Sequence, residues 1–248
     1  MDLYPITLGT GRMLKKAAPS SSDTAQTKKG QSQSAPTMRT AVPNDLKKEI
    51  FTRDDHTCQC CGFHSEKYQQ ILFKDFNLNN LSPDNLLTTC IFCQQCFDLP
   101  EVAKMRSGVL VWLPEIEQRD LNNISRAIYI ARISQGPVAD TVRKILDLIM
   151  ERREEAVQRI STDDPFILST VLNDYLPPKA YAQREKKLAG LRLFPLDRRI
   201  IKEADLEFNQ FPQILAYWRS KNGPFGGKAP QQWVSIYEDI ASEALSAA

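Results

Sequence analysis

Apolar residues recur three and four positions apart over much of the second half of the chain, a spacing that places them on one face of a helix. The pattern predicts a helix from about Glu115 to Ser134 and a second from about Val138 to Ile160, joined at Gln135-Gly136-Pro137 as an antiparallel pair. The apolar faces, which we expect to be buried, contain Leu121, Ile124, Ile128 and Ala131 in the first helix and Val142, Ile145, Ile149 and Ala156 in the second.

Further helices are predicted towards the C-terminus. Asp163 or Asp164 caps a helix that starts at Pro165, a role that suits these carboxylates better than acid–base catalysis, for which no partner is evident. Two last helices, 196–221 and 229–247, are joined by a glycine-rich turn. Their aromatic residues either form an exposed groove for a partner or pack on the preceding helices; they are Phe208, Phe211, Tyr217, Trp218, Trp233 and Tyr237.

The first half of the chain predicts shorter elements. A helix begins at Asn44, and strands are predicted at 68–73 and 108–113. Pro83 begins a brief helix that carries Leu86 and Leu87. Ahead of these elements, residues 1–14 form either a β-hairpin around Gly9-Thr10-Gly11 or part of a flexible terminus, and residues 15–42 form a flexible linker of Ser, Thr, Gln, Ala, Lys and Pro.

The charge is unevenly divided between the N-terminal segment and the rest of the chain. Residues 1–40 carry a net charge of +4, whereas the remainder carries −2. A nearly neutral folded part argues against binding to a phosphate backbone, which usually requires a basic surface. No apolar run approaches the length that crosses a bilayer, so we expect no membrane insertion.

All six cysteines lie between residues 57 and 97. Two Cys-x-x-Cys pairs separated by one folded excursion are the layout of a structural tetrathiolate zinc site, because each pair supplies two soft ligands from a tight turn. The predicted ligands are Cys58, Cys61, Cys90 and Cys93, and Cys96 is a possible alternative ligand. Cys60 belongs to neither Cys-x-x-Cys pair. Disulfides would need an oxidising compartment, and a redox pair would need one Cys-x-x-Cys motif at the start of a helix, so zinc is favoured.

The two cysteine pairs resemble the opening and closing knuckles of HNH endonuclease domains, in the segments 53–62 (RDDHTCQCCG) and 85–93 (NLLTTCIFC). An HNH nuclease needs histidines to activate water and to bind a divalent ion. At those places this chain has Gln69, Gln70 and Gln94, whose amides cannot act as general bases. We therefore expect an HNH or treble-clef-like ββα zinc module without nuclease activity.

The chain also resembles a narrower group, the IcmJ (DotN) family of type IVB (Dot/Icm) secretion systems. The resemblance runs from about Lys47 to Leu193 and rests on the segments IFTRDDHTCQCCGFHSEKYQQI, NNLSPDNLLTTCIFCQQCF and GVLVWLPEIEQRDLNNI. It implies a protein without enzymatic activity that binds the C-terminal cytoplasmic extension of a DotL-like coupling ATPase and, indirectly, secretion chaperones of the IcmS and IcmW kind. It also implies a cytoplasmic location, peripheral to the inner membrane.

Together these patterns predict an α+β, mostly helical protein, with a zinc module at 43–113 and a helical region at 114–248 packed on it. The leading functional hypothesis is a structural adaptor that supports substrate recruitment in a secretion system. The alternatives are a metal-dependent endonuclease that uses His56 or His64, the only two histidines of the chain, and a zinc-dependent nucleic-acid-binding protein.

Overall fold

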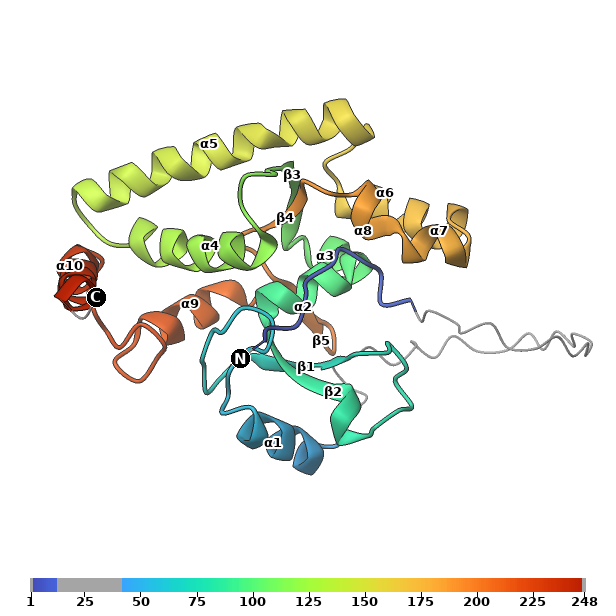
Figure 1. Ribbon diagram of the computed structural model, residues 1–248, viewed down its shortest axis with the longest axis horizontal. Helices are drawn as coiled ribbons and strands as arrows, with labels where there is room; N and C mark the ends of the chain where they lie inside the picture. Colours follow the sequence, from blue (N-terminus) through green and yellow to red (C-terminus); the bar gives the residue numbers. More distant parts are fainter. Residues whose placement is uncertain (1, 13–41, 247–248) are drawn as a thin grey trace, which may run out of the picture.

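The computed structural model describes residues 2–12 and 42–246, which form an α+β fold with small antiparallel sheets (Figure 1). The α-helices are α1 (Asn44–Arg53), α2 (Ile91–Phe97), α3 (Leu99–Met105), α4 (Gln118–Arg132), α5 (Pro137–Ile160), α6 (Pro165–Thr170), α7 (Pro178–Ala182), α8 (Arg184–Lys187), α9 (Phe211–Arg219) and α10 (Gln231–Ser246). The strands are β1 (Gln69–Phe73), β2 (Leu86–Cys90), β3 (Gly108–Trp112), β4 (Leu191–Pro195), β5 (Ile200–Glu203) and β6 (Leu206–Asn209), with a 3-10 turn η1 (Pro83–Asn85) and a π-helical turn η2 (Val171–Tyr175). Among the described residues no helix is long and apolar enough to span a bilayer.

The strands pair as three separate two-stranded antiparallel sheets. β1 and β2 form a hairpin in which Gln69 pairs with Cys90, and α2 begins directly after β2. β3 pairs with β4, so that Gly108 lies opposite Pro195, and β5 forms a hairpin with β6. The predicted helix around Leu86 and Leu87 is wrong, because the helical turn stops at Asn85 and both leucines belong to β2, where Leu86 is completely buried.

The long helices α4 and α5 form the predicted antiparallel pair, and α5 also packs on β3 (Figure 1). Ile128 and Ala131 of α4 are buried as expected, at 3% and 1% exposure. Ile124 and Ile145 are not, since 37% and 38% of their surfaces are exposed. The buried face of α4 instead includes polar residues, among them Asn122 and Arg126, which contact the cysteine pairs.

The C-terminal region differs from the two predicted helices. Residues 196–209 contain the β5–β6 hairpin, and only α9 of the first predicted helix is helical. Trp218 of α9 is 1% exposed and packs edge-on against Phe92 and Phe63, with ring centroids 5.5 and 5.6 Å apart. The interior interpretation of the aromatic cluster is therefore confirmed for Trp218, whereas Tyr237 on α10 is 72% exposed.

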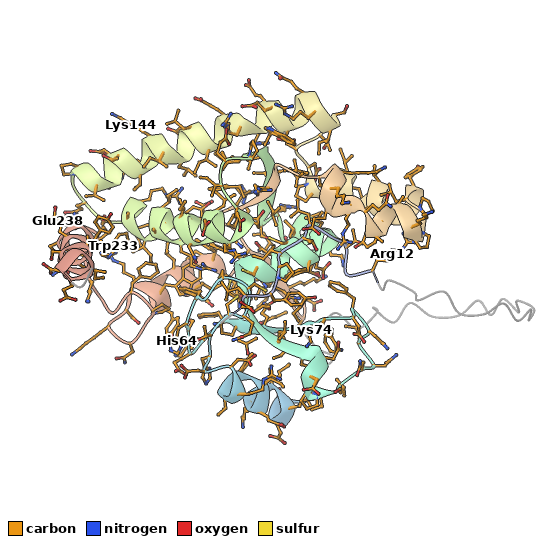
Figure 2. All side chains as sticks on the ribbon, viewed as in Figure 1. Arg12, His64, Lys74, Lys144, Trp233 and Glu238 are labelled. Carbon is orange, nitrogen blue, oxygen red and sulfur yellow. The ribbon has the colours of Figure 1, made fainter. Side chains whose placement is uncertain are left out.

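Residues 2–12 run across α2 and α3 towards α8. The hairpin predicted for residues 1–14 extends beyond the described residues and stays a prediction. The backbone N–H of Gly9 donates to the carbonyl of Cys96, and the N–H of Leu99 donates back to the carbonyl of Gly9. Arg184 of α8 donates to the carbonyl of Leu8, which joins this segment to α8. In Figure 2, Arg12 lies at the opposite side of the molecule from Trp233 and Glu238 on α10. The predicted linker 15–42 lies outside the described residues apart from Val42.

Candidate metal centre

The first cysteine pair lies in a tight turn that follows α1. The N–H of Cys58 donates to the carbonyl of Phe63, and the N–H of Gly62 donates to the carbonyl of Cys58, both at 2.9 Å. Gly62 has a φ angle of +75°, which glycine adopts without the steric cost that a β-carbon would bring. The turn thereby brings Cys58 and Cys61 together at one end of the β1–β2 hairpin.

The second pair lies where β2 passes into α2. Cys90 is the last residue of β2 and the N-cap of α2, and its Sγ accepts a hydrogen bond from the N–H of Cys93 at 3.4 Å. A cap of this kind fixes the direction in which the cysteine side chain points. Cys93 follows in the first turn of the helix.

The fold collects the sulfurs of both pairs into one buried group. The Sγ atoms of Cys58, Cys61, Cys90 and Cys93 all lie within 4.8 Å of one another, and this is the only group of three or more potential ligands found among the described residues. A tetrahedral zinc ion with bonds of about 2.3 Å holds its sulfurs about 3.8 Å apart, and the Sγ atoms of Cys61 and Cys90 are 3.7 Å apart. The four cysteines therefore fit a metal ion, and they are the four residues predicted as ligands.

The two remaining cysteines lie outside this group. Cys96 is fully buried among apolar side chains that include Leu99 and Val102 of α3, and its thiol donates to the carbonyl of Phe92 at 3.4 Å. Cys60 is also buried but does not belong to the sulfur group. The geometry thus favours the predicted set over one that includes Cys96, and the assignment of ligands stays a prediction that metal analysis can test.

Burial and mutual contact perturb the pKa values of the four thiols. Burial raises the pKa of Cys90 and of Cys93 well above the ordinary value of a cysteine. Burial also opposes ionisation of Cys58, but hydrogen bonds from neighbouring thiols outweigh it and lower the pKa of Cys58. Four thiolates so close together in a buried site require cations to stabilise them.

Helix α4 supplies two donors to the sulfurs that the sequence analysis missed. Asn122 donates from Nδ2 to Cys93 Sγ at 3.3 Å, and Arg126 donates from Nη2 to the Sγ atoms of Cys90 and Cys61. Burial alone would lower the pKa of Arg126, but the charges of the cysteines outweigh burial and raise it. Asn122 and Arg126 are four residues apart on the buried helix face, so polar residues at helical spacing beside an apolar stripe were the available signal.

Comparison with known proteins identifies the family. No protein-family model matches the chain. The chain is 30% identical, over 162 residues, to "Type 4 apparatus protein DotN" of Legionella pneumophila subsp. pneumophila strain Philadelphia 1; the match covers 64% of this chain and 75% of the relative. The chain belongs to the DotN family. The family resemblance that the sequence motifs indicated is thereby confirmed, and the buried group of four cysteines is compatible with a zinc module in this DotN-family chain.

The histidines and glutamines of this DotN-family protein lie around the cysteine group in non-ligand positions. His56 and His64 place their Nε2 atoms 3.5 and 3.6 Å from the carboxylate of Glu66, at the surface beside the first cysteine pair. Gln69 donates to the carbonyls of His56 and Phe63, so its amide holds the first turn in place. Figure 2 labels His64 at the surface of the molecule.

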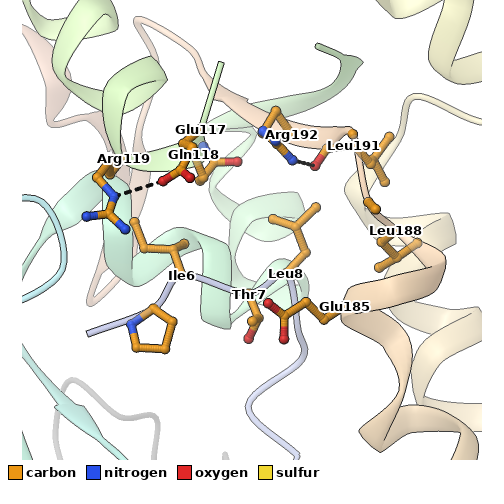
Figure 3. Close-up of a pocket in the computed structure, with 13 residues that line it drawn as sticks. Ile6, Thr7, Leu8, Glu117, Gln118, Arg119, Glu185, Leu188, Leu191 and Arg192 are labelled. Carbon is orange, nitrogen blue, oxygen red and sulfur yellow. Dashed lines mark hydrogen bonds and ion pairs between the residues drawn. The ribbon is translucent and has the colours of Figure 1, made fainter. Parts of the chain in front are cut away.

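The surface of the DotN-family fold has several hollows, and one of about 340 Å³ is lined by Cys61. A different hollow, also of about 340 Å³, lies between residues 5–8, the start of α4 and the approach to β4 (Figure 3). Three of the charged side chains at its edge have partners: Arg119 lies 3.1 Å from Glu117, and Arg192 donates to the carbonyls of Ile116 and Leu191. No cysteine lines this hollow, so it is separate from the candidate metal centre.

Proposed function

We propose that the chain is a non-enzymatic adaptor component of a type IVB (Dot/Icm) secretion system, stabilised by a structural zinc ion. The observation that carries this proposal is membership of the DotN family, whose Legionella relative is named a type 4 apparatus protein. In this proposal the chain binds the C-terminal cytoplasmic extension of the DotL-like coupling ATPase. Through that extension it supports effector recruitment by chaperones of the IcmS and IcmW kind.

The zinc ion in this proposal is held by Cys58, Cys61, Cys90 and Cys93. Soft thiolate donors in a closed set of four favour zinc over harder divalent ions such as magnesium. The order of a β1–β2 hairpin followed by α2, with ligands on the first turn and at the start of the helix, supports an HNH-like ββα module over residues 43–113. The ion would stabilise this module and supply no reaction step.

The residues beside the hairpin support a role without hydrolysis. A cavity of about 180 Å³ lies next to β1, where an HNH nuclease would hold its catalytic residues. Among the described residues that line this cavity there is no histidine, aspartate or glutamate; its polar lining includes Gln69 and Gln70. On α2, Gln94 accepts a hydrogen bond from the hydroxyl of Thr89 at 2.8 Å. Amides in these positions stabilise the hairpin but cannot activate water.

The partner proposal is tested by co-expression of the full chain with the C-terminal extension of the coupling ATPase. We expect the two to co-purify as a stable complex, and the same chain with Cys58→Ser to be lost from it because the module unfolds. Failure of the wild-type chain to co-purify would contradict the adaptor role. The proposed location, peripheral to the inner membrane on its cytoplasmic side, predicts that the chain fractionates with membranes only when the ATPase is present.

The absence of nuclease activity is tested separately. Supercoiled plasmid is incubated with the purified chain and either magnesium or manganese, beside a His56→Ala, His64→Ala double variant. We expect neither protein to nick the plasmid. Nicking by the wild-type chain that is lost in the double variant would overturn the non-enzymatic assignment.

A further inference from the structure

A tetrathiolate site holding a divalent ion has an excess of two negative charges. In the buried position of these four cysteines, that charge lacks the solvation that water would give it. Buried charge of this size persists in proteins only where a counter-charge and hydrogen-bond donors lie close to it. The question is which residue of this chain supplies the positive charge.

Arg126 is placed to supply it. Its side chain is 1% exposed, and its Nη2 donates to Cys90 Sγ and, at 3.6 Å, to Cys61 Sγ. Among the described residues no aspartate or glutamate forms an ion pair with Arg126; its Nη1 donates instead to the neutral side chain of Asn123 at 2.6 Å. The cysteine sulfurs are therefore its anionic partners, one sulfur from each Cys-x-x-Cys pair.

Three aromatic rings enclose the guanidinium on its other sides. The Cζ atom lies 4.1 Å from the ring centroid of Phe63, 5.1 Å from that of Phe92 and 6.0 Å from that of Trp218. Aromatic faces attract cations, and the attraction is stronger where water is excluded. The rings come from the first cysteine turn, α2 and α9, so one side chain of α4 contacts three other parts of the fold.

We propose that Arg126 is the counter-cation of the tetrathiolate centre, and that metal binding at the cysteines and docking of α4 and α9 on the cysteine module form one coupled process. The inference rests on the metal site of the proposed function. Asn122 is part of the same contact, because it donates to Cys93 from the same face of α4. When the ion is lost, the thiolates take up protons and lose the negative charge that compensates the buried guanidinium. Loss of Arg126 leaves the two excess negative charges of the loaded site without this counter-cation.

The test uses the full chain loaded with zinc or with cobalt. Arg126→Met removes the charge and keeps much of the volume, whereas Arg126→Lys keeps the charge and loses the planar fork of donors. Arg132→Met is the matched control, since Arg132 lies in the same helix but pairs with Asp197 on a partly exposed surface. Zinc affinity is measured by competition with a chromophoric chelator, and the sulfur-to-cobalt charge-transfer absorption is recorded for each variant.

We expect Arg126→Met to weaken zinc binding at least tenfold, in the range seen when partners of metal ligands are removed. Its charge-transfer band should move to longer wavelength, because sulfurs without the guanidinium are more electron-rich. Arg126→Lys should lose less affinity than Arg126→Met, and Arg132→Met should match the wild type in both measurements. Wild-type affinity together with an unshifted band in Arg126→Met would overturn the proposal and leave Arg126 as a packing residue.

A second measurement covers the case in which Arg126→Met does not fold. Amide hydrogen exchange of the wild-type chain is followed with zinc bound and after removal of zinc by a chelator. Loss of protection in both α4 and α9 on zinc removal supports the coupling, and retained protection in α4 overturns it. A wild-type chain that binds no zinc at all would instead contradict the proposed function, so the two failures are distinguishable.

Discussion

The sulfur atoms of Cys61 and Cys90 lie 3.7 Å apart, although 29 positions separate the two residues in the sequence. The first belongs to a turn after α1 and the second ends β2, and the β1–β2 hairpin brings these positions together. A sulfur contact of this length matches the edge of a zinc–thiolate tetrahedron. Metal binding and folding of the hairpin are therefore expected to be linked.

Substitution of one ligand tests this link. We expect Cys58→Ser or Cys90→Ser to lose bound zinc and to unfold the module, since structural zinc contributes about 10–16 kcal/mol in isolated finger peptides. Cys96→Ser is the matched control, because Cys96 is equally buried but lies outside the sulfur group, and it should retain one zinc ion per chain. Elemental analysis and thermal unfolding measure the two effects. Loss of zinc in Cys96→Ser would restore Cys96 as the alternative ligand.

Asp98 predicts a pH dependence of stability. Burial, with a smaller contribution from the charge of Glu101, raises the pKa of Asp98 to about 6, although its side chain caps α3 by accepting from the Glu101 N–H. Because the folded-state pKa is raised, the folded chain binds more protons than the unfolded chain between about pH 4 and 6. The stability contributed by this group is therefore full below pH 4 and lost as pH rises through 6.

Asp98→Asn should remove this dependence, since the amide oxygen can still cap α3. We expect the variant to gain about 1–3 kcal/mol over the wild type as pH rises from 4 to 7, and the difference to stay constant above pH 7. Urea unfolding of both proteins at each pH measures it, and loss of zinc at low pH affects both alike. A difference that shrinks with rising pH would contradict the assigned sign.

Gly190 and Trp112 predict a steric cost at the β3–β4 sheet. A β-carbon at Gly190, which has a φ angle of +89°, would lie 2.7 Å from Trp112 Cζ2. Gly190→Ala should therefore cost about 1–2 kcal/mol for the backbone and about 1–3 kcal/mol more for overpacking. Gly226→Ala should show the backbone cost alone, because its φ angle is +59° but no atom lies within 4 Å. Equal destabilisation of the two variants in urea would disprove the steric contribution.

Trp218 and Tyr237 predict opposite outcomes for two aromatic residues of the C-terminal region. Trp218→Ala removes an indole that packs against Phe63, Phe92 and Phe211, and should cost about 3–5 kcal/mol of the free energy of unfolding. Tyr237→Ala should change it by less than about 0.5 kcal/mol, because that side chain is 72% exposed. Thermal unfolding distinguishes them, and a large effect at Tyr237 would show that α10 packs more closely than its exposure indicates.

Local sequence determined the elements whose signals are contained within a few residues. The spacing of Cys58, Cys61, Cys90 and Cys93 predicted the sulfur group because each pair is formed by one turn, and helical periodicity predicted α4 and α5. The family was also readable from motifs around these cysteines. These features depend on short-range geometry, which can be predicted from the spacing of residues in the sequence.

Only the tertiary structure decided the contacts between distant segments. The pairing of β3 with β4 places Gly108 opposite Pro195. The sequence of a five-residue strand does not indicate which distant strand it pairs with. The burial of Arg126 is the clearest case, because arginine is ordinarily a surface residue and its position on α4 gives no sign of the sulfurs and rings around it. Its charge is stabilised inside the protein by sulfurs and aromatic rings that three other segments bring to it, and that convergence is a property of packing.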